Sequence, residues 1–314
     1  MTAAATRKQI ALGLGLSFAW LALARLVAYY GVLALPRSLA SHLTLHSYLS
    51  LVLVLVTGCG LLGARLLLDE PREALGATRP SLFGSLAGLL AGPVVLALSA
   101  YVAFKVALPT LIAEITAGGK QAAEANTGEF GRALVESQAT TTLLWGVLLT
   151  PLAEELLFRG VLWTAITRAT APTDSAAASL PAGLITEGFV VKAIRRVVGL
   201  LRRGGIATLV TAAIFAAMHA DQSGGAGIVR VAQTASLGLA LGVARQASGS
   251  IFPGMLLHAA FNALTVAKLR RWLAGPSWPL PLPIPVIWWQ LAAGAALLLA
   301  LLAGYAVWRR RATA

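Results

Sequence analysis

Charged residues are scarce in this sequence. They make up 12% of the 314 residues, whereas hydrophobic residues make up 58% and the mean hydropathy is +0.78. Soluble domains contain about 25% charged residues, so this composition excludes an ordinary soluble domain. We predict an all-α, polytopic membrane bundle of about eight transmembrane helices, with residues 1–314 as a single membrane domain. The expected spans are residues 9–35, 45–68, 82–108, 138–166, 205–221, 228–247, 250–268 and 284–308.

Cysteine is almost absent as well. The single cysteine, Cys59, falls in the second expected span and cannot form a disulfide within the chain. No histidine or acid lies within helical reach of it in the sequence, so a thiol protease is not indicated. A cleaved signal peptide is not indicated either, because the apolar run after Lys8 is too long and lacks a small-residue cleavage site. We expect the first span to remain as an anchor.

Acidic residues are half as numerous as basic ones, and the net charge is +13. With the N-terminus inside, most basic residues, Arg245 among them, fall on the expected inner side, so the positive-inside rule places both termini in the cytoplasm. The basic residues from Lys268 to Arg271 fall on the expected outer side and oppose this orientation. The charge therefore predicts anionic lipid as a partner and no nucleic acid. The Ala-rich, Lys-poor composition favours a bacterial inner (cytoplasmic) membrane.

Two expected inner segments interrupt the apolar runs. Residues 69–80 should contain a short polar helix that begins near Pro71. Residues 187–203 place apolar side chains on one helical face and basic side chains on the other. This pattern is typical of a basic amphipathic helix that lies in the membrane interface. A solvated loop helix is the alternative.

Two adjacent carboxylates, Glu154 and Glu155, lie in the middle of a span. An ionisable group at that depth is costly unless it is paired or faces a polar cavity, so a functional site is indicated. Arg159 follows Glu155 by four residues, which favours an ion pair on one helical face. Glu154 points about 100° away and could act as a general base on water. The alternative is a buried salt bridge that clamps two helices together.

Histidine and asparagine side chains in two further spans could complete such a site. His219 closes an apolar run, and His258 and Asn262 share a helical face because they are four residues apart. Side chains of this kind can stabilise the oxyanion of amide hydrolysis, or they can form hydrogen bonds between helices. Zinc at Glu154, His219 and His258 is a further alternative. The sequence has no H-E-x-x-H motif, so we favour a site without metal or other cofactor.

Three ordered segments now stand out: PLAEELLFRG at 151–160, FAAMH at 215–219 and HAAFN at 258–262. Together they resemble the motifs of the CPBP (Abi) family of intramembrane endopeptidases, which includes the CaaX prenyl endopeptidases. The resemblance places the catalytic core motifs at 140–265.

The resemblance implies an eight-helix membrane fold and a role for each matched residue. Glu154 would activate water, His219 would assist it, and His258 with Asn262 would hold the oxyanion. Glu155 and Arg159 would be supporting residues by the same resemblance.

We therefore predict an intramembrane endopeptidase that hydrolyses a peptide bond near the C-terminus of a membrane-associated protein. The resemblance leaves open a CaaX-like tail or a sorting signal, as in the myxosortase branch, as the substrate. A non-proteolytic scaffold or immunity protein of the same family is the alternative. A transporter is less favoured because no repeat halves are evident. The glycine-rich turn at 221–227 favours a site that water reaches from the extracytoplasmic side.

Overall fold

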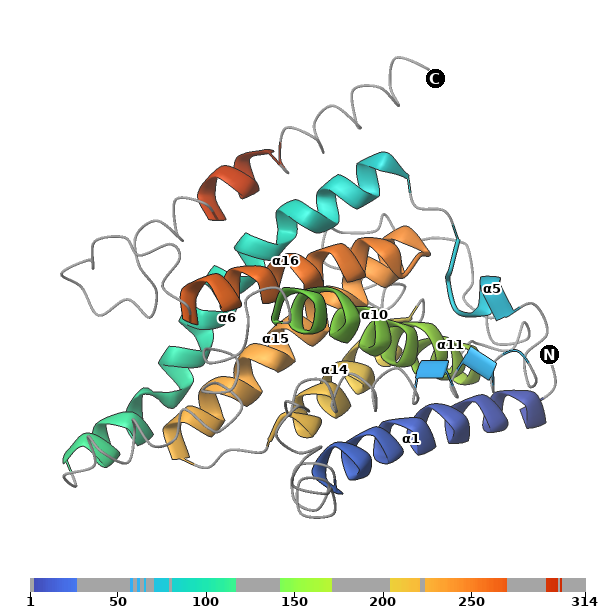
Figure 1. Cartoon of the computed structure of the whole chain (residues 1–314), viewed down its shortest axis with the longest axis horizontal. Helices are drawn as coiled ribbons and strands as arrows, with labels where there is room; N and C mark the ends of the chain where they lie inside the picture. The colour runs from blue at the N-terminus through green and yellow to red at the C-terminus, as the bar shows by residue number, and fades with distance from the viewer. Residues whose placement is uncertain are drawn as a thin grey trace, which may run out of the picture.

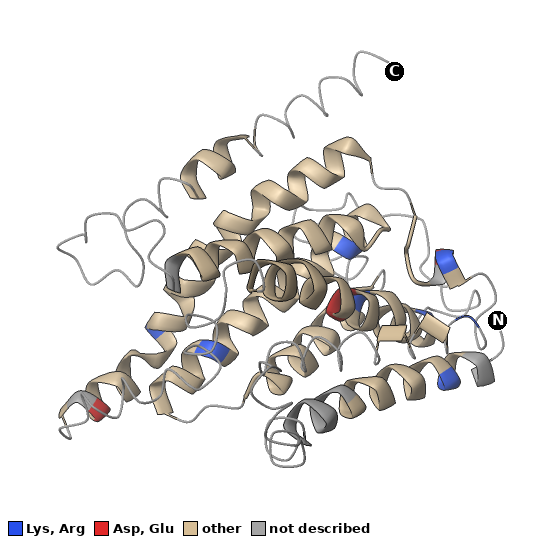
Figure 2. Ribbon diagram, in the orientation of Figure 1, with Lys and Arg blue, Asp and Glu red and all other residues tan. Residues whose placement is uncertain are grey.

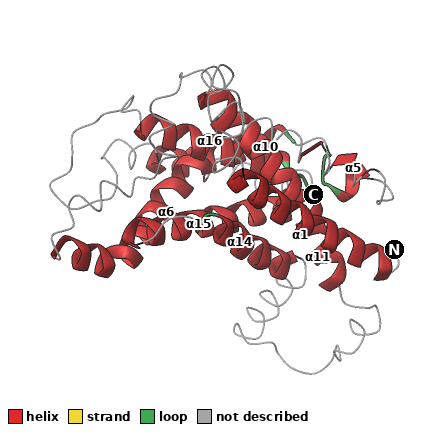
Figure 3. Cartoon of the chain, turned by 60° about the horizontal axis from the view of Figure 1, so that its bottom comes forward, coloured by secondary structure: helices red, strands yellow, loops and turns green. Residues whose placement is uncertain are grey.

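The computed structural model is a helical bundle, with no strand in the part of the chain that it describes. The described residues are 3–26, 57–58, 61–62, 65, 71–78, 81–116, 142–170, 204–220, 224–269, 292–298 and 300. Figure 3 shows helices and a few short loops in this part of the chain. The prediction of an all-α membrane bundle is confirmed. Cys59, the amphipathic segment 187–203 and the basic pair Arg270 and Arg271 lie outside the described residues, so the predictions about them stay predictions.

Two of the described helices are long and apolar enough to cross a membrane. They are α6 (Leu82–Thr116) and α15 (Gly224–Ser248). Two shorter apolar helices, α14 (Ile206–Met218) and α16 (Phe252–Leu269), accompany them. In Figure 1, α6 and α16 lie side by side, and α15 packs against both of them.

The fourth predicted span is a continuous helix that changes its winding along its length. It consists of η2 (Leu143–Leu149), α10 (Thr150–Glu155), η3 (Leu156–Leu162) and α11 (Trp163–Thr170). Both η2 and η3 are π-helical, and they flank the carboxylate pair. The first helix, α1 (Ala3–Leu26), packs along η3 and α11. The expected short helix after the second span is α5 (Pro71–Ala74).

Small residues allow the membrane helices to approach closely. A Cβ atom added at Gly88 of α6 would overlap the backbone of Pro253 on α16, and one at Gly242 of α15 would lie 2.5 Å from Thr208 Cγ2 on α14. Apolar burial alone cannot hold helices together in lipid, because the lipid tails are equally apolar. Close packing at these glycines therefore stabilises the bundle.

The interior around the carboxylate helix is apolar and partly aromatic. Its buried members include Phe158, Leu162, Phe215, Leu237 and Phe261, which come from four different helical segments. Figure 2 shows how few charged positions interrupt the described helices, with acidic residues in the middle of the bundle. α10, which carries Glu154 and Glu155, occupies that place in Figure 1. The fold thus surrounds a small polar cluster with apolar side chains.

Candidate active site

The two carboxylates are at the end of α10 and are buried inside the bundle. Glu154 is 4% exposed and Glu155 is 0% exposed. The ion pair expected from the four-residue spacing is present, since Arg159 Nη1 lies 3.1 Å from Glu155 Oε1. Arg159 is itself fully buried. The cost of placing these charges in an apolar bundle is therefore offset by direct pairing.

The guanidinium of Arg159 has further partners besides Glu155. Its Nη2 donates to the carbonyl oxygen of Gly238 at 3.0 Å, which connects η3 to α15. Its carbon Cζ lies 4.9 Å from the ring centroid of Phe215, within the range of a cation–π interaction. Arg159 therefore fixes Glu155 relative to two neighbouring helices, α14 and α15.

Arg159 lies in η3, which is π-helical, whereas the helix that follows, α11, is regular. The amide of Trp163 donates to the carbonyl of Phe158, five residues earlier. A π-helical turn is rare and is found frequently at functional sites, because it changes the direction of side chains relative to a regular helix. Nothing in the sequence indicates this winding, and we predicted an uninterrupted span there.

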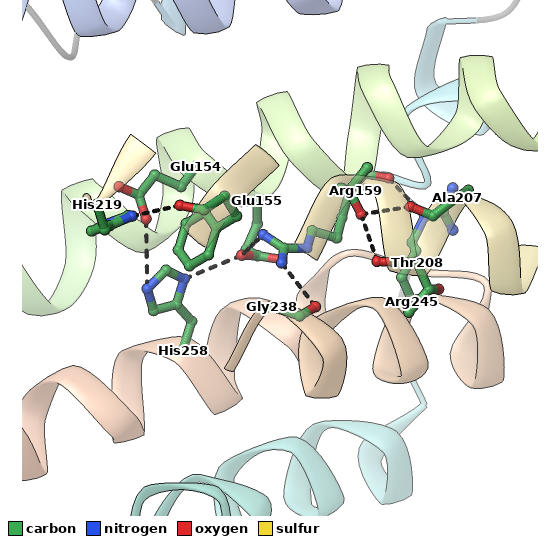
Figure 4. A network of polar contacts seen from close by, with 11 residues as sticks. Glu154, Glu155, Arg159, Ala207, Thr208, His219, Gly238, Arg245 and His258 are labelled. Atoms are coloured by element: carbon green, nitrogen blue, oxygen red, sulfur yellow. Dashed lines mark hydrogen bonds and ion pairs between the residues drawn. The ribbon is translucent and has the colours of Figure 1, made fainter. Parts of the chain in front are cut away.

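His258 lies between the two carboxylates (Figure 4). Its Nδ1 is 3.1 Å from Glu155 Oε1, and its Nε2 is 3.6 Å from Glu154 Oε2. The resemblance implied a role for His258 at the oxyanion, whereas in the structure both ring nitrogens face acids. The His258 ring therefore connects the two carboxylates through its two nitrogens.

His219 follows the last residue of α14 and is oriented by its own helix. Its Nδ1 lies 2.7 Å from the carbonyl oxygen of Phe215. Because a carbonyl only accepts, Nδ1 carries the hydrogen, and Nε2 is the acceptor nitrogen of the neutral ring. The Phe215 ring lies 4.7 Å from the His219 ring and 5.9 Å from the His258 ring, measured between centroids. The three sequence segments thus meet around Phe215.

Asn262 lies one turn after His258 on α16 and is half-buried. Its Nδ2 donates to the carbonyl oxygen of Gly146 at 2.8 Å, which connects α16 to η2. The hydrogen bond between helices that we considered as an alternative is therefore present. The amide has a second hydrogen, which an oxyanion role would use.

Zinc at Glu154, His219 and His258 stays an alternative. Within the described part of the chain, no group of three or more His, Cys, Asp or Glu side chains has the arrangement to hold a metal ion. Glu154 and His258 are close, but both nitrogens of His258 face carboxylate oxygens. A zinc ion there would take one of those nitrogens and an oxygen of Glu154 as ligands.

Two charged residues that connect helices were not recognised from the sequence. Arg245 was assigned to the inner segments, yet it is only 5% exposed and contacts the carbonyl of Arg159. Glu114, at the end of α6, accepts a hydrogen bond of 2.8 Å from the amide of Gly225 and so caps α15. The assignment of Arg245 to the inner side stays a prediction, and its burial was not foreseen because a position at the end of a predicted span does not reveal which way the side chain points.

Comparison with known families gives one match. Residues 136–264 match the family described as Type II CAAX prenyl endopeptidase Rce1-like. This segment is similar to that family. It contains all three motifs and supports the assignment to the CPBP family over about two fifths of the chain. No curated protein and no solved structure matches the chain.

The match to the Rce1-like family bears on the reaction class and the substrate class. The Rce1-like family is a protease family that acts on membrane-associated protein substrates, which supports a peptidase activity and a protein substrate for this chain. The apolar helices α6 and α15 agree with a location in a membrane. The cluster of Glu154, Glu155, Arg159 and His258 lies inside the matched segment.

Proposed function

We propose that this protein is an intramembrane endopeptidase that hydrolyses a peptide bond near the C-terminus of a membrane-associated protein. The observation that supports this most is the buried carboxylate of Glu154, 3.6 Å from His258 Nε2, inside the segment that matches the Rce1-like family. A structural clamp needs one acid for Arg159, and Glu155 supplies it. Glu154 is then the acid that remains for chemistry.

In the proposed reaction, Glu154 acts as the general base on water. Its carboxylate takes one proton, and the hydroxide attacks the carbonyl carbon of the scissile peptide bond. The tetrahedral intermediate collapses when the C–N bond breaks, and the proton from Glu154 passes to the leaving nitrogen. Glu155 and Arg159 hold His258 beside Glu154 throughout.

His219 and Asn262 have the remaining roles in the proposed reaction. Since His219 donates from Nδ1 to Phe215, its Nε2 is suited to accept a hydrogen from the same water that Glu154 activates. The second amide hydrogen of Asn262 is suited to the developing oxyanion, because the first already fixes the side chain to Gly146. A donor whose position is fixed before the reaction needs no reorganisation during it.

We propose that the reaction needs no metal. The experiment is cleavage in proteoliposomes before and after treatment with 1,10-phenanthroline and EDTA. We expect an unchanged rate, because Glu154 and His258 supply the base and its partner. Loss of cleavage that added zinc restores would contradict a metal-independent reaction.

The substrate class is tested with two internally quenched peptides in proteoliposomes. One ends in a farnesylated CaaX tail, and the other ends in a transmembrane anchor of the sorting-signal type. We expect cleavage of the anchored peptide, because a cluster buried among apolar helices suits a substrate that is itself in the membrane. Mass spectrometry of the products locates the bond. The scaffold alternative predicts that neither peptide is cleaved.

We also propose that both termini are cytoplasmic and that water reaches the site from the extracytoplasmic side. A cysteine introduced at Ser223, in a Cys59→Ser background, should react with a membrane-impermeant thiol reagent on intact spheroplasts. Reaction only after the membrane is permeabilised would reverse the orientation. A cytoplasmic substrate of the CaaX kind would then be favoured.

A further inference from the structure

A second buried arginine lies next to the site and has no part in the proposed reaction. Arg245 is in the last turn of α15 and is 5% exposed. In the described part of the chain, the carboxylates near the site pair with Arg159 and His258, and none pairs with Arg245. A buried cation without an acid is costly inside a membrane protein. Its contacts therefore point to a specific role.

The contacts of Arg245 lie along one face of the helix that carries the carboxylates. Its Nε donates to the carbonyl oxygen of Arg159 at 3.1 Å, and its Nη2 lies 3.4 Å from Thr164 Oγ1. Its Cζ lies 5.0 Å from the ring centroid of Trp163. These positions span the end of η3, where the winding changes from π-helical to regular. Nη1 donates to the carbonyl of Gly249, just after α15.

We infer that Arg245 is a positioning residue for the proposed catalytic pair, a role that rests on the function proposed above. Arg245 fixes the backbone at Arg159 through its carbonyl. Arg159 in turn holds Glu155, and Glu155 holds His258 beside Glu154. Figure 4 shows Arg245 at one end of this network and Glu154 at the other.

The turn after α5 covers the other side of this arginine. Gly76 has a φ of 67°, and a Cβ atom there would overlap the guanidinium of Arg245. The carbonyl of Gly76 also accepts a 3.0 Å hydrogen bond from the amide of Ile251, between α15 and α16. A side chain at position 76 should therefore displace Arg245 without changing any residue of the site.

The first experiment measures amide hydrogen exchange of the protein in proteoliposomes without substrate. In Arg245→Met, we expect deuterium uptake in peptides covering 156–164 to rise at least about threefold, while uptake in α6 and α16 stays unchanged. Thr208→Val is the structural control, because it removes the 3.1 Å hydrogen bond from Trp163 Nε1 and leaves the Arg159 carbonyl bond intact. Unchanged uptake in 156–164, or an equal rise throughout the bundle, would overturn the inference.

The second experiment measures steady-state cleavage of the peptide that the wild-type protein cleaves. Arg245→Met should lower kcat about 10- to 100-fold and leave KM within about twofold, because the reacting groups are misplaced and substrate contacts are not. Arg245→Lys should restore part of kcat, and a rise in KM alone would contradict a positioning role. If the wild type cleaves neither peptide, the proposed function fails, and the exchange experiment still decides the role of Arg245.

A matched pair of glycine variants tests the role of Arg245 without replacing Arg245 itself. Gly249 has a φ of 68° and nothing within 4 Å of an added Cβ, whereas Gly76 has nearly the same φ and faces the guanidinium. Both alanine variants carry the same backbone strain, and Gly249→Ala keeps the carbonyl that accepts from Arg245 Nη1, but only Gly76→Ala places a side chain against the guanidinium of Arg245. We expect Gly76→Ala alone to raise exchange in 156–164. Equal effects of the two variants would contradict the inference.

Discussion

Replacement of Arg159 by methionine tests the buried ion pair at the centre of the site. The variant leaves the carboxylate of Glu155 without its cation and the carbonyl of Gly238 without its donor. Removal of one partner from a buried ion pair costs about 3–5 kcal/mol, and an unsatisfied buried acceptor costs about 1–3 kcal/mol more. These effects overlap, so we expect a loss of about 4–6 kcal/mol in the free energy of unfolding.

The loss can be measured by reversible unfolding in mixed micelles of a mild detergent and SDS. About 4 kcal/mol raises the unfolded fraction roughly a thousandfold, which such titrations resolve easily. Arg159→Lys should fall between the wild type and Arg159→Met, because a lysine lacks the planar fork that reaches Glu155 and Gly238 together.

The double variant Arg159→Met with Glu155→Gln separates the ion pair from the packing. Because it removes both charges, it should recover about 2 kcal/mol or more relative to Arg159→Met alone. A single variant within about 1 kcal/mol of the wild type would refute the reasoning. So would a double variant whose loss equals the sum of the two single losses.

Two further predictions concern the bundle itself. Glu114→Ala removes the acceptor for the amide of Gly225 and should lower the free energy of unfolding by about 1 kcal/mol in the same titration; no change would contradict the capping role. Gly88→Val should lower it by about 1–3 kcal/mol, because the side chain overlaps the Pro253 backbone, whereas Gly15→Val meets nothing within 4 Å and serves as the control. Equal losses in the two valine variants would contradict the close packing.

Local spacing predicted the pairs that lie on one helix. Glu155 and Arg159 are four residues apart, and a helix brings such residues together whatever surrounds it. The apolar runs likewise predicted α6, α14, α15 and α16 to within several residues. Both inferences depend only on the period of the helix and its length, which the sequence contains directly.

Contacts between helices could not be predicted from the sequence. His258 is 103 residues from Glu155, and no periodic pattern shows that its ring lies between two carboxylates. The π-helical winding of η3 depends on hydrogen bonds five residues apart, which the same residues could replace by regular ones. Arg245 lies near the end of a predicted span, where most basic residues face the lipid headgroups, so its burial follows only from the packing of α15 against η3.

The central claim is that Glu154 activates water, and the single-turnover rate of peptide cleavage by Glu154→Gln tests it most directly. Glutamine keeps the size and the hydrogen-bonding oxygen of the side chain but cannot take a proton from water. Glu114→Gln is the matched control, because it makes the same chemical change at the end of α6 and keeps the acceptor for Gly225. We expect Glu154→Gln to cleave about 10²–10⁴-fold more slowly than the wild type, with Glu114→Gln unchanged. A Glu154→Gln rate equal to that of Glu114→Gln would contradict the claim.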